Sequence, residues 1–136
     1  AKNATKLGAQ VGFHEGNLLE PIWPNELKRH GRVIIAANLP YLSTDMWETS
    51  PEEVREFEPK QALVSDSNDG LDLYRELLMQ IQSRRDEFPK DLFVLLEIDP
   101  RQESIVNTMV NEIFEDATVQ IKNDLAGEPR VVILTL

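Results

Sequence analysis

The tetrapeptide Asn38-Leu39-Pro40-Tyr41 is the part of the sequence best suited to chemistry, and it directly follows the apolar run 33–37. In open α/β sheets, ligands bind just beyond the carboxyl ends of strands, so we expect a site here. The Asn38 carbonyl can accept one hydrogen bond from a planar NH2 group, and the Leu39 backbone carbonyl can accept a second. Pro40 holds Leu39 extended, and Tyr41 offers a flat face for an amide or a base.

Two acceptors that hold one NH2 group can draw the nitrogen lone pair out of conjugation and point it at an electrophile. None of these residues is a strong base, and none is needed when the electrophile is a sulfonium cofactor. The cofactor then carries the reactivity and the protein supplies alignment. Four residues alone also allow a structural interpretation, in which Asn38 caps a turn and Tyr41 belongs partly to the core.

The surrounding pattern predicts a single α/β domain with a mainly parallel sheet that would position this tetrapeptide. Two continuous apolar runs, 33–37 and 92–96, are typical of parallel strands covered on both faces. Apolar spacing and capping signals predict four helices, over about 1–7, 51–57, 70–88 and 99–113. The remaining expected elements are a short strand at 11–14, a helical turn at 25–30, and a terminal hairpin of strands 117–122 and 130–136.

Composition narrows the class of protein. The net charge of −10 disfavours general binding to phosphate backbones, so nucleic acid is not expected as a partner. No apolar run approaches the roughly 18 residues that span a bilayer, so no membrane is expected. The absence of cysteine excludes thiolate metal sites and fits a cytoplasmic protein. His14 and His30 lack ligand spacing, so we expect no metal.

Six short blocks along the chain match one known pattern in both order and spacing. The blocks are Phe13–Pro21, Asn38–Tyr41, Val54–Pro59 with Ala62-Leu63, Asp69–Arg75, Leu96-Glu97-Ile98 with Gln102, and Asp124–Gly127 with Arg130. Together they resemble the C-terminal part of the catalytic domain of the HemK/PrmC methyltransferases, which methylate a glutamine side chain in peptide-release factors. The resemblance covers almost the whole chain, and the blocks are specific only as a set.

The resemblance implies a Rossmann-like class I methyltransferase fold that uses S-adenosylmethionine to methylate the glutamine of the release factor's Gly-Gly-Gln loop. The catalytic residues would be Asn38-Leu39-Pro40-Tyr41, with Asn38 binding the glutamine amide and Tyr41 completing the pocket.

The same resemblance assigns residues outside the tetrapeptide. Asn17 and Leu18 would lie with Asn38 beside the cofactor, and Glu58 and Pro59 would shape the substrate side. Much of the cofactor site would lie upstream of this chain, because the family's glycine-rich loop does not occur in it.

Three departures from the family leave alternatives open. Leu39 replaces a family proline, and Asn-Leu-Pro-Tyr also resembles the rRNA adenine dimethylases, so methylation of adenine N6 in RNA or DNA is an alternative activity. Asn17 replaces a family aspartate near the cofactor. The family's first two strands have no counterpart here, which suggests a truncated domain over 1–136 that is inactive alone, or a non-catalytic remnant.

In the family's strand order 3-2-1-4-5-7-6, this chain would keep strands 3 to 7, so the strand at 33–37 would have an open, apolar edge. We therefore expect the chain to self-associate through that edge and to bind the cofactor weakly or not at all.

Overall fold

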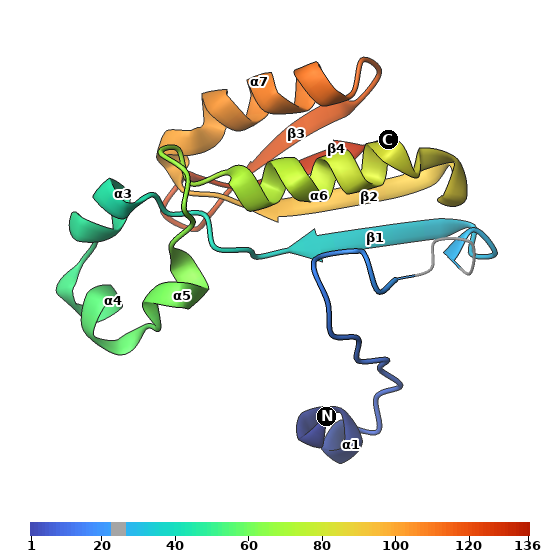
Figure 1. Cartoon of the computed structure of the whole chain (residues 1–136), viewed down its shortest axis with the longest axis horizontal. Coiled ribbons are helices and arrows are strands. Elements are labelled where there is room, and N and C mark those ends of the chain that lie inside the picture. The colour runs from blue at the N-terminus through green and yellow to red at the C-terminus, as the bar shows by residue number, and fades with distance from the viewer. Residues whose placement is uncertain (23–26) are drawn as a thin grey trace.

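The computed structural model describes residues 1–22 and 27–136 as a four-stranded sheet with helices packed on one face (Figure 1). The strands are β1 (Arg32–Ala37), β2 (Asp91–Glu97), β3 (Thr118–Asn123) and β4 (Pro129–Thr135). The helices are α1 (Lys2–Leu7), α3 (Thr44–Glu48), α4 (Glu52–Phe57), α5 (Lys60–Leu63), α6 (Asp72–Ser83) and α7 (Glu103–Ile113). Two 3-10 turns, η1 (Arg85–Glu87) and η2 (Pro100–Gln102), flank β2.

The sheet is mixed, with strand order β1-β2-β4-β3. Only β1 and β2 are parallel, pairing Ile34 with Phe93 and Ala36 with Leu95, whereas β4 is antiparallel to both of its neighbours. The prediction of a mainly parallel sheet is therefore wrong for the described residues. The tight β3–β4 connection forces an antiparallel pair, and β4 then inserts beside β2. This order agrees with the expected succession of strands 4, 5, 7 and 6.

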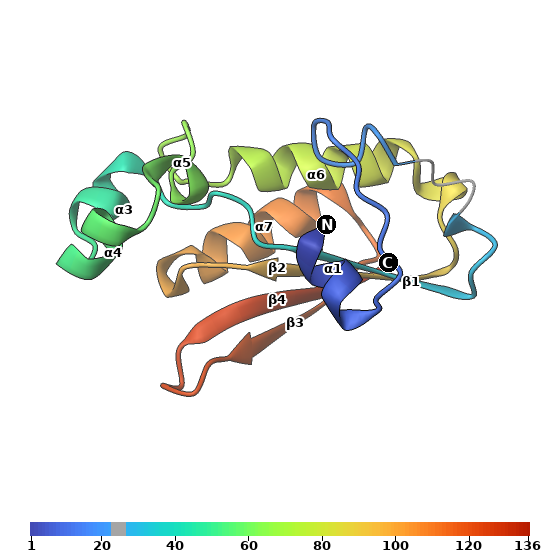
Figure 2. The same ribbon diagram turned by 90° about the horizontal axis from the view of Figure 1, so that it is seen from below.

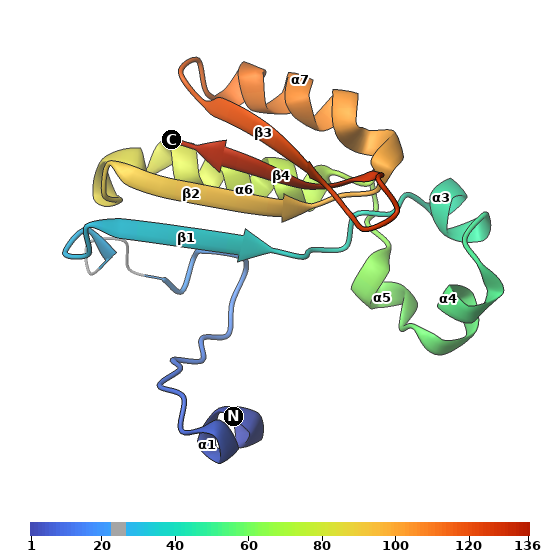
Figure 3. The same cartoon turned by 180° about the vertical axis from the view of Figure 1, so that it is seen from behind.

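The core lies between the sheet and the two long helices, which cover the same face in all three views (Figures 1, 2 and 3). On that face Leu92, Val94, Leu96, Val132 and Leu134 are fully buried. The helices pack the following buried side chains against this face: Tyr74, Leu77, Leu78, Ile81, Val106, Met109 and Val110. Each such aliphatic side chain contributes about 2 kcal/mol through the apolar area it buries, so this layer supports the strand ends.

Most of the predicted helices form close to their expected limits. The first ends at Gly8, whose left-handed backbone (φ +64°) lets its N–H bond back to the last turn. Asp99 and Gln102 form the predicted capping box, although the first turn after Asp99 is 3-10. The helix expected over 70–88 stops at Ser83, and 3-10 turn η1 follows. Helices α3 and α5 were not predicted, and residues 25 and 26 of the expected turn lie outside the described residues.

No helix in the described part of the chain has the length and apolarity needed to cross a bilayer.

The strand expected over 11–14 does not form. Residues 9–15 have no regular secondary structure, and the Phe13 side chain is 64% exposed. An alternating apolar pattern becomes a strand only when a neighbour pairs its backbone, and none of the described strands lies beside it. Figure 2 shows this segment and α1 extending away from the sheet.

Strand β1 is an edge strand within the described structure, because β2 is its one paired neighbour. Its side chains alternate between the helix-covered face and the opposite face, where Ile34 is 63% exposed. The guanidinium of Arg32 lies 5.4 Å from the centre of the Phe93 ring on this uncovered face. An edge with the sequence Val-Ile-Ile-Ala-Ala and a single charge has little to prevent pairing with another chain.

We propose that this edge mediates self-association, and that Ile34→Lys shifts the chain toward the monomer. The added charge would sit on the uncovered face of the edge strand, where pairing would bring two copies of it together. Light scattering coupled to size-exclusion chromatography measures the effect. Ile105→Lys is the matched control, because Ile105 is an exposed isoleucine on α7 and should leave the mass distribution unchanged. A monodisperse unmodified monomer would contradict the proposal.

Candidate active site at the end of β1

Asn38 lies immediately after β1, with an exposed side chain that borders a shallow surface pocket of about 240 Å³. The other residues lining the pocket are Ala36, Ala37, Leu95, Glu97 and Val131. Among the described residues, the Asn38 carboxamide makes no hydrogen bond, so its carbonyl is available to a ligand. The side chain therefore occupies the kind of position that the sequence predicts for a site, at the carboxyl end of a strand.

The backbone of Leu39 is fixed by a tyrosine from α6. The Leu39 N–H donates to the Tyr74 hydroxyl at 3.4 Å, and that hydroxyl donates to the backbone carbonyl of Glu97 at 2.5 Å. Burial raises the pKa of Tyr74, so the hydroxyl stays protonated and able to donate. The Leu39 carbonyl accepts no hydrogen bond from the described residues, so it is free to act as the second acceptor.

Tyr41 is 9% exposed and belongs to the hydrophobic core, so its ring does not offer the open flat face that the sequence suggested. Its hydroxyl instead donates to the Glu97 carboxylate at 3.1 Å. Burial, followed by the nearby charge of Glu97, raises the pKa of Tyr41 to about 12, so the donor is retained at neutral pH. Tyr41 thus connects the segment after β1 to the end of β2.

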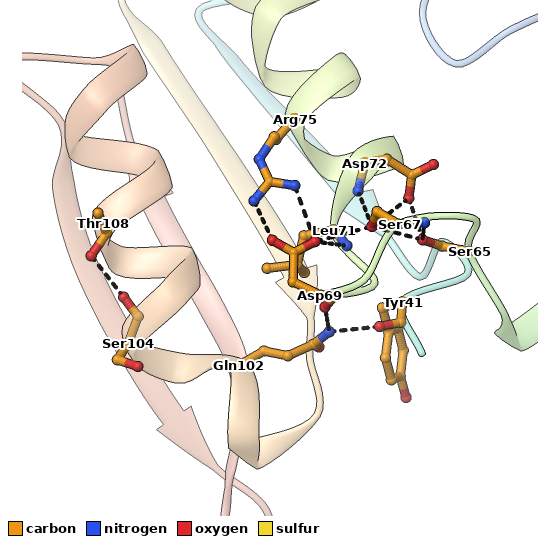
Figure 4. Close-up of polar contacts among 10 residues, drawn as sticks. All are labelled: Tyr41, Ser65, Ser67, Asp69, Leu71, Asp72, Arg75, Gln102, Ser104 and Thr108. Carbon is orange, nitrogen blue, oxygen red and sulfur yellow. Dashed lines mark hydrogen bonds and ion pairs between the residues drawn. The ribbon is translucent and has the colours of Figure 1, made fainter. Parts of the chain in front are cut away.

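Gln102 is fully buried and joins three segments around the site (Figure 4). Its side-chain NH2 donates to the Tyr41 carbonyl at 2.6 Å and to the Asp69 carbonyl at 2.7 Å. Its side-chain oxygen accepts from the Asp99 N–H at 3.1 Å. Gly70 packs against the same contact, which leaves no room for a side chain there. These hydrogen bonds hold residues 41, 69–70 and 99–102 together.

The loop before α6 is ordered by a second set of polar contacts, also drawn in Figure 4. Asp69 forms a two-pronged ion pair with Arg75 and accepts hydrogen bonds from the Leu71 N–H at 3.1 Å and the Ser67 hydroxyl at 3.0 Å. The hydrogen bonds from Arg75 hold the pKa of Asp69 well below its usual range. The acidic cluster is thus a structural turn, in agreement with the rejection of a metal loop there.

The residues expected beside the cofactor are attached to α6 and do not line the pocket with Asn38. The Asn17 amide donates to the Glu76 carboxylate, and the Gln80 carbonyl accepts from the Leu19 N–H at 2.9 Å. Leu18 has a left-handed backbone (φ +52°) and packs partly on the core. The structure thus brings 17–19 to the same helix that supports Leu39, without closing a cavity between them.

Glu58 and Pro59 lie between α4 and α5, both with exposed side chains. Figure 1 shows the α3–α5 segment beyond the carboxyl ends of β1 and β2, on the same side as Asn38. The segment is joined back by hydrogen bonds between Leu42 and residues 63 and 65. Trp47 is buried in the core, which confirms a packing role, whereas Trp23 lies outside the described residues.

Comparison with characterised proteins gives consistent matches along the whole chain. It is 36% identical over 131 residues to the release factor glutamine methyltransferase of Bacillus subtilis, and 33% identical over 131 residues to that of Bacillus anthracis. The Enterococcus faecalis enzyme of the same name is 30% identical over 132 residues. Each match covers 96–97% of this chain. This chain belongs to the release factor glutamine methyltransferase (HemK/PrmC) family.

The chain spans 43–44% of the length of these relatives, so it corresponds to part of a family member. No family profile matches the chain. The mixed sheet is compatible with part of a methyltransferase fold.

Three residues around the site escaped the sequence reasoning, although each lies in a block that resembles this family. Glu97 follows a buried strand just as Asn38 does, and this parallel position was the available signal. Gln102 was recognised only as part of a capping signature, and Tyr74 only as part of an apolar helix face. Their hydrogen bonds join residues 23 to 61 positions apart, which local patterns do not report.

Proposed function

We propose that the protein carrying this chain is an enzyme that transfers a methyl group from S-adenosylmethionine to the glutamine side-chain nitrogen of a peptide-release factor. The observation that supports this most directly is the free Asn38 carboxamide at the pocket beyond β1, in a chain whose relatives are named for this reaction. The substrate would present its Gly-Gly-Gln loop to this pocket, and Glu58 and Pro59 would contact the release factor from the α3–α5 side.

The proposed chemistry relies on alignment of a weak nucleophile. The Asn38 side-chain oxygen and the Leu39 backbone carbonyl would each accept one hydrogen of the glutamine NH2 group. Pyramidalisation of that nitrogen would direct its lone pair away from the amide plane and toward the methyl donor. Tyr74 fixes the Leu39 backbone through the Leu39 N–H, which keeps the opposite-facing carbonyl available.

S-adenosylmethionine would supply the electrophilic methyl group when bound. The pocket of about 240 Å³ is smaller than the roughly 300–1,000 Å³ of sites that enclose a small-molecule ligand. The described residues alone therefore do not enclose such a cofactor. We infer that Asn17, Leu18 and Asn38 would contribute one side of its site, and that the rest comes from outside this chain.

Methylation of adenine N6 is the alternative, because its exocyclic NH2 group fits the same pair of acceptors. The net charge of −10 and the names of the relatives both favour glutamine.

The test is transfer of labelled methyl from S-adenosylmethionine by the natural protein that carries this chain. We expect label in the release factor, lost when its Gly-Gly-Gln glutamine is replaced by alanine, and no label in ribosomal RNA. Label in ribosomal RNA with none in the release factor would establish the alternative. An absence of label in both would contradict methyl transfer to either substrate.

A further inference from the structure

The carboxylate of Glu97 is the one acidic group that lines the Asn38 pocket. Glu97 is the last residue of β2, and its position opposite Val131 of β4 directs its side chain to the same face of the sheet as Leu95 and Ala36. These are the apolar residues that form the floor of the pocket. The ends of two parallel strands therefore bring Asn38 and Glu97 to the same opening.

The carboxylate is only partly satisfied by the protein. One of its oxygen atoms accepts the hydrogen bond from Tyr41 at 3.1 Å, and among the described residues neither oxygen forms a salt bridge. The side chain is half-buried, so water compensates it less fully than it would at the surface. A carboxylate in this state is an acceptor only, and it would gain from a ligand that brings an N–H donor.

The Tyr41 hydroxyl determines how the carboxylate is oriented. Because Tyr41 stays protonated and buried, it holds one Glu97 oxygen toward the core and leaves the second oxygen for the pocket. A glutamine amide and a glutamate carboxylate have nearly the same shape, so shape alone cannot distinguish them. A fixed negative charge can, because it attracts the NH2 group of the amide and repels the acid.

We propose that Glu97 is a substrate-selecting residue, which accepts an N–H hydrogen bond from the target amide and excludes the corresponding carboxylate. This inference rests on the proposed function and adds the basis of its selectivity. Asn38 and Leu39 alone would hold the NH2 group. Glu97 adds a requirement that the ligand carry hydrogen rather than negative charge at that position.

The experiment is an NMR titration of the ¹⁵N-labelled chain with two peptides that differ only in Gly-Gly-Gln against Gly-Gly-Glu. The side-chain NH2 signals of Asn38 report binding at this pocket. For the unmodified chain we expect the glutamine peptide to bind at least about 10-fold more tightly, as a hydrogen bond to a charged group allows. In Glu97→Gln we expect the ratio to fall close to one. This variant keeps the side-chain shape and an oxygen for the Tyr41 hydroxyl, and its backbone amide spectrum checks the fold.

Glu112→Gln is the matched control, because it removes the same charge from an exposed position on α7 and should retain the preference. Equal binding of both peptides by the unmodified chain would overturn the inference. So would an unchanged ratio in Glu97→Gln, or no shift of the Asn38 signals with the glutamine peptide. Selective peptide binding without methyl transfer to the release factor would count against the proposed function alone, whereas methyl transfer with an unchanged ratio would count against Glu97 alone.

Discussion

Replacing Gly70 with alanine is expected to lower the free energy of unfolding by roughly 3–5 kcal/mol, from backbone strain and overpacking together. Gly70 has φ +79°, which an L side chain rarely adopts. A methyl group there would lie 2.0 Å from the Tyr41 carbonyl oxygen and 2.9 Å from the Gln102 side-chain nitrogen. The chain could relieve this only by breaking the hydrogen bond between those two atoms. Urea denaturation followed by circular dichroism measures the loss.

Gly127→Ala separates the two causes. Gly127 also has a positive φ, of +89°, but a methyl group there would meet no atom within 4 Å. It should therefore show only the backbone strain, about 1 kcal/mol. Equal losses for the two variants would mean that the contact between Gly70, Tyr41 and Gln102 is not tight. Because that contact also carries Tyr41, a large loss for Gly70→Ala would show that the site and the fold share one support.

Sequence reasoning was most successful where a local pattern determines the structure. The runs 33–37 and 92–96 became the parallel pair, because uninterrupted apolar residues need a neighbour and a covered face. Asp99, Pro100 and Gln102 predicted a helix start, because capping hydrogen bonds involve residues only three positions apart. The terminal hairpin formed for the same reason, since its turn residues lie between its two strands.

It failed where the outcome depends on distant partners. Val11 to His14 has the alternation of a strand but no neighbour within the described structure, so the pattern had nothing to pair with. Helices α3 and α5 were missed because they have five and four residues, too few for periodicity to show. Their positions depend instead on the bridge between Leu42 and Val64.

The candidate site divides in the same way. The position of Asn38 followed from a general rule about strand ends, and the structure places its side chain at an open pocket. The role of Tyr41 was misjudged, because its sequence neighbours do not reveal that its ring is enclosed by the core and its hydroxyl directed at Glu97. Composition identifies groups able to accept a hydrogen bond, but only the packing shows which acceptors remain unused.

Replacing Asn38 with alanine is expected to reduce kcat/KM for release-factor methylation by about 100-fold or more in the natural protein that carries this chain. Removing one positioned hydrogen-bonding group from a reacting centre typically has an effect of this size. Stability should be almost unchanged, because the Asn38 side chain is exposed and makes no hydrogen bond to the described residues. The pair of measurements is methyl transfer and thermal unfolding, made on the same preparation.

Asn107→Ala is the matched control, since Asn107 is an exposed asparagine on α7, away from β1, and should keep both activity and stability. The contrast with Gly70 gives the prediction its force. A residue that supports the site through packing should lose stability first, whereas a residue that holds the substrate should lose activity at constant stability. Normal kcat/KM in Asn38→Ala would show that the NH2 group is held elsewhere. A large drop in its unfolding temperature would assign Asn38 to the structural role that its four-residue motif also allows.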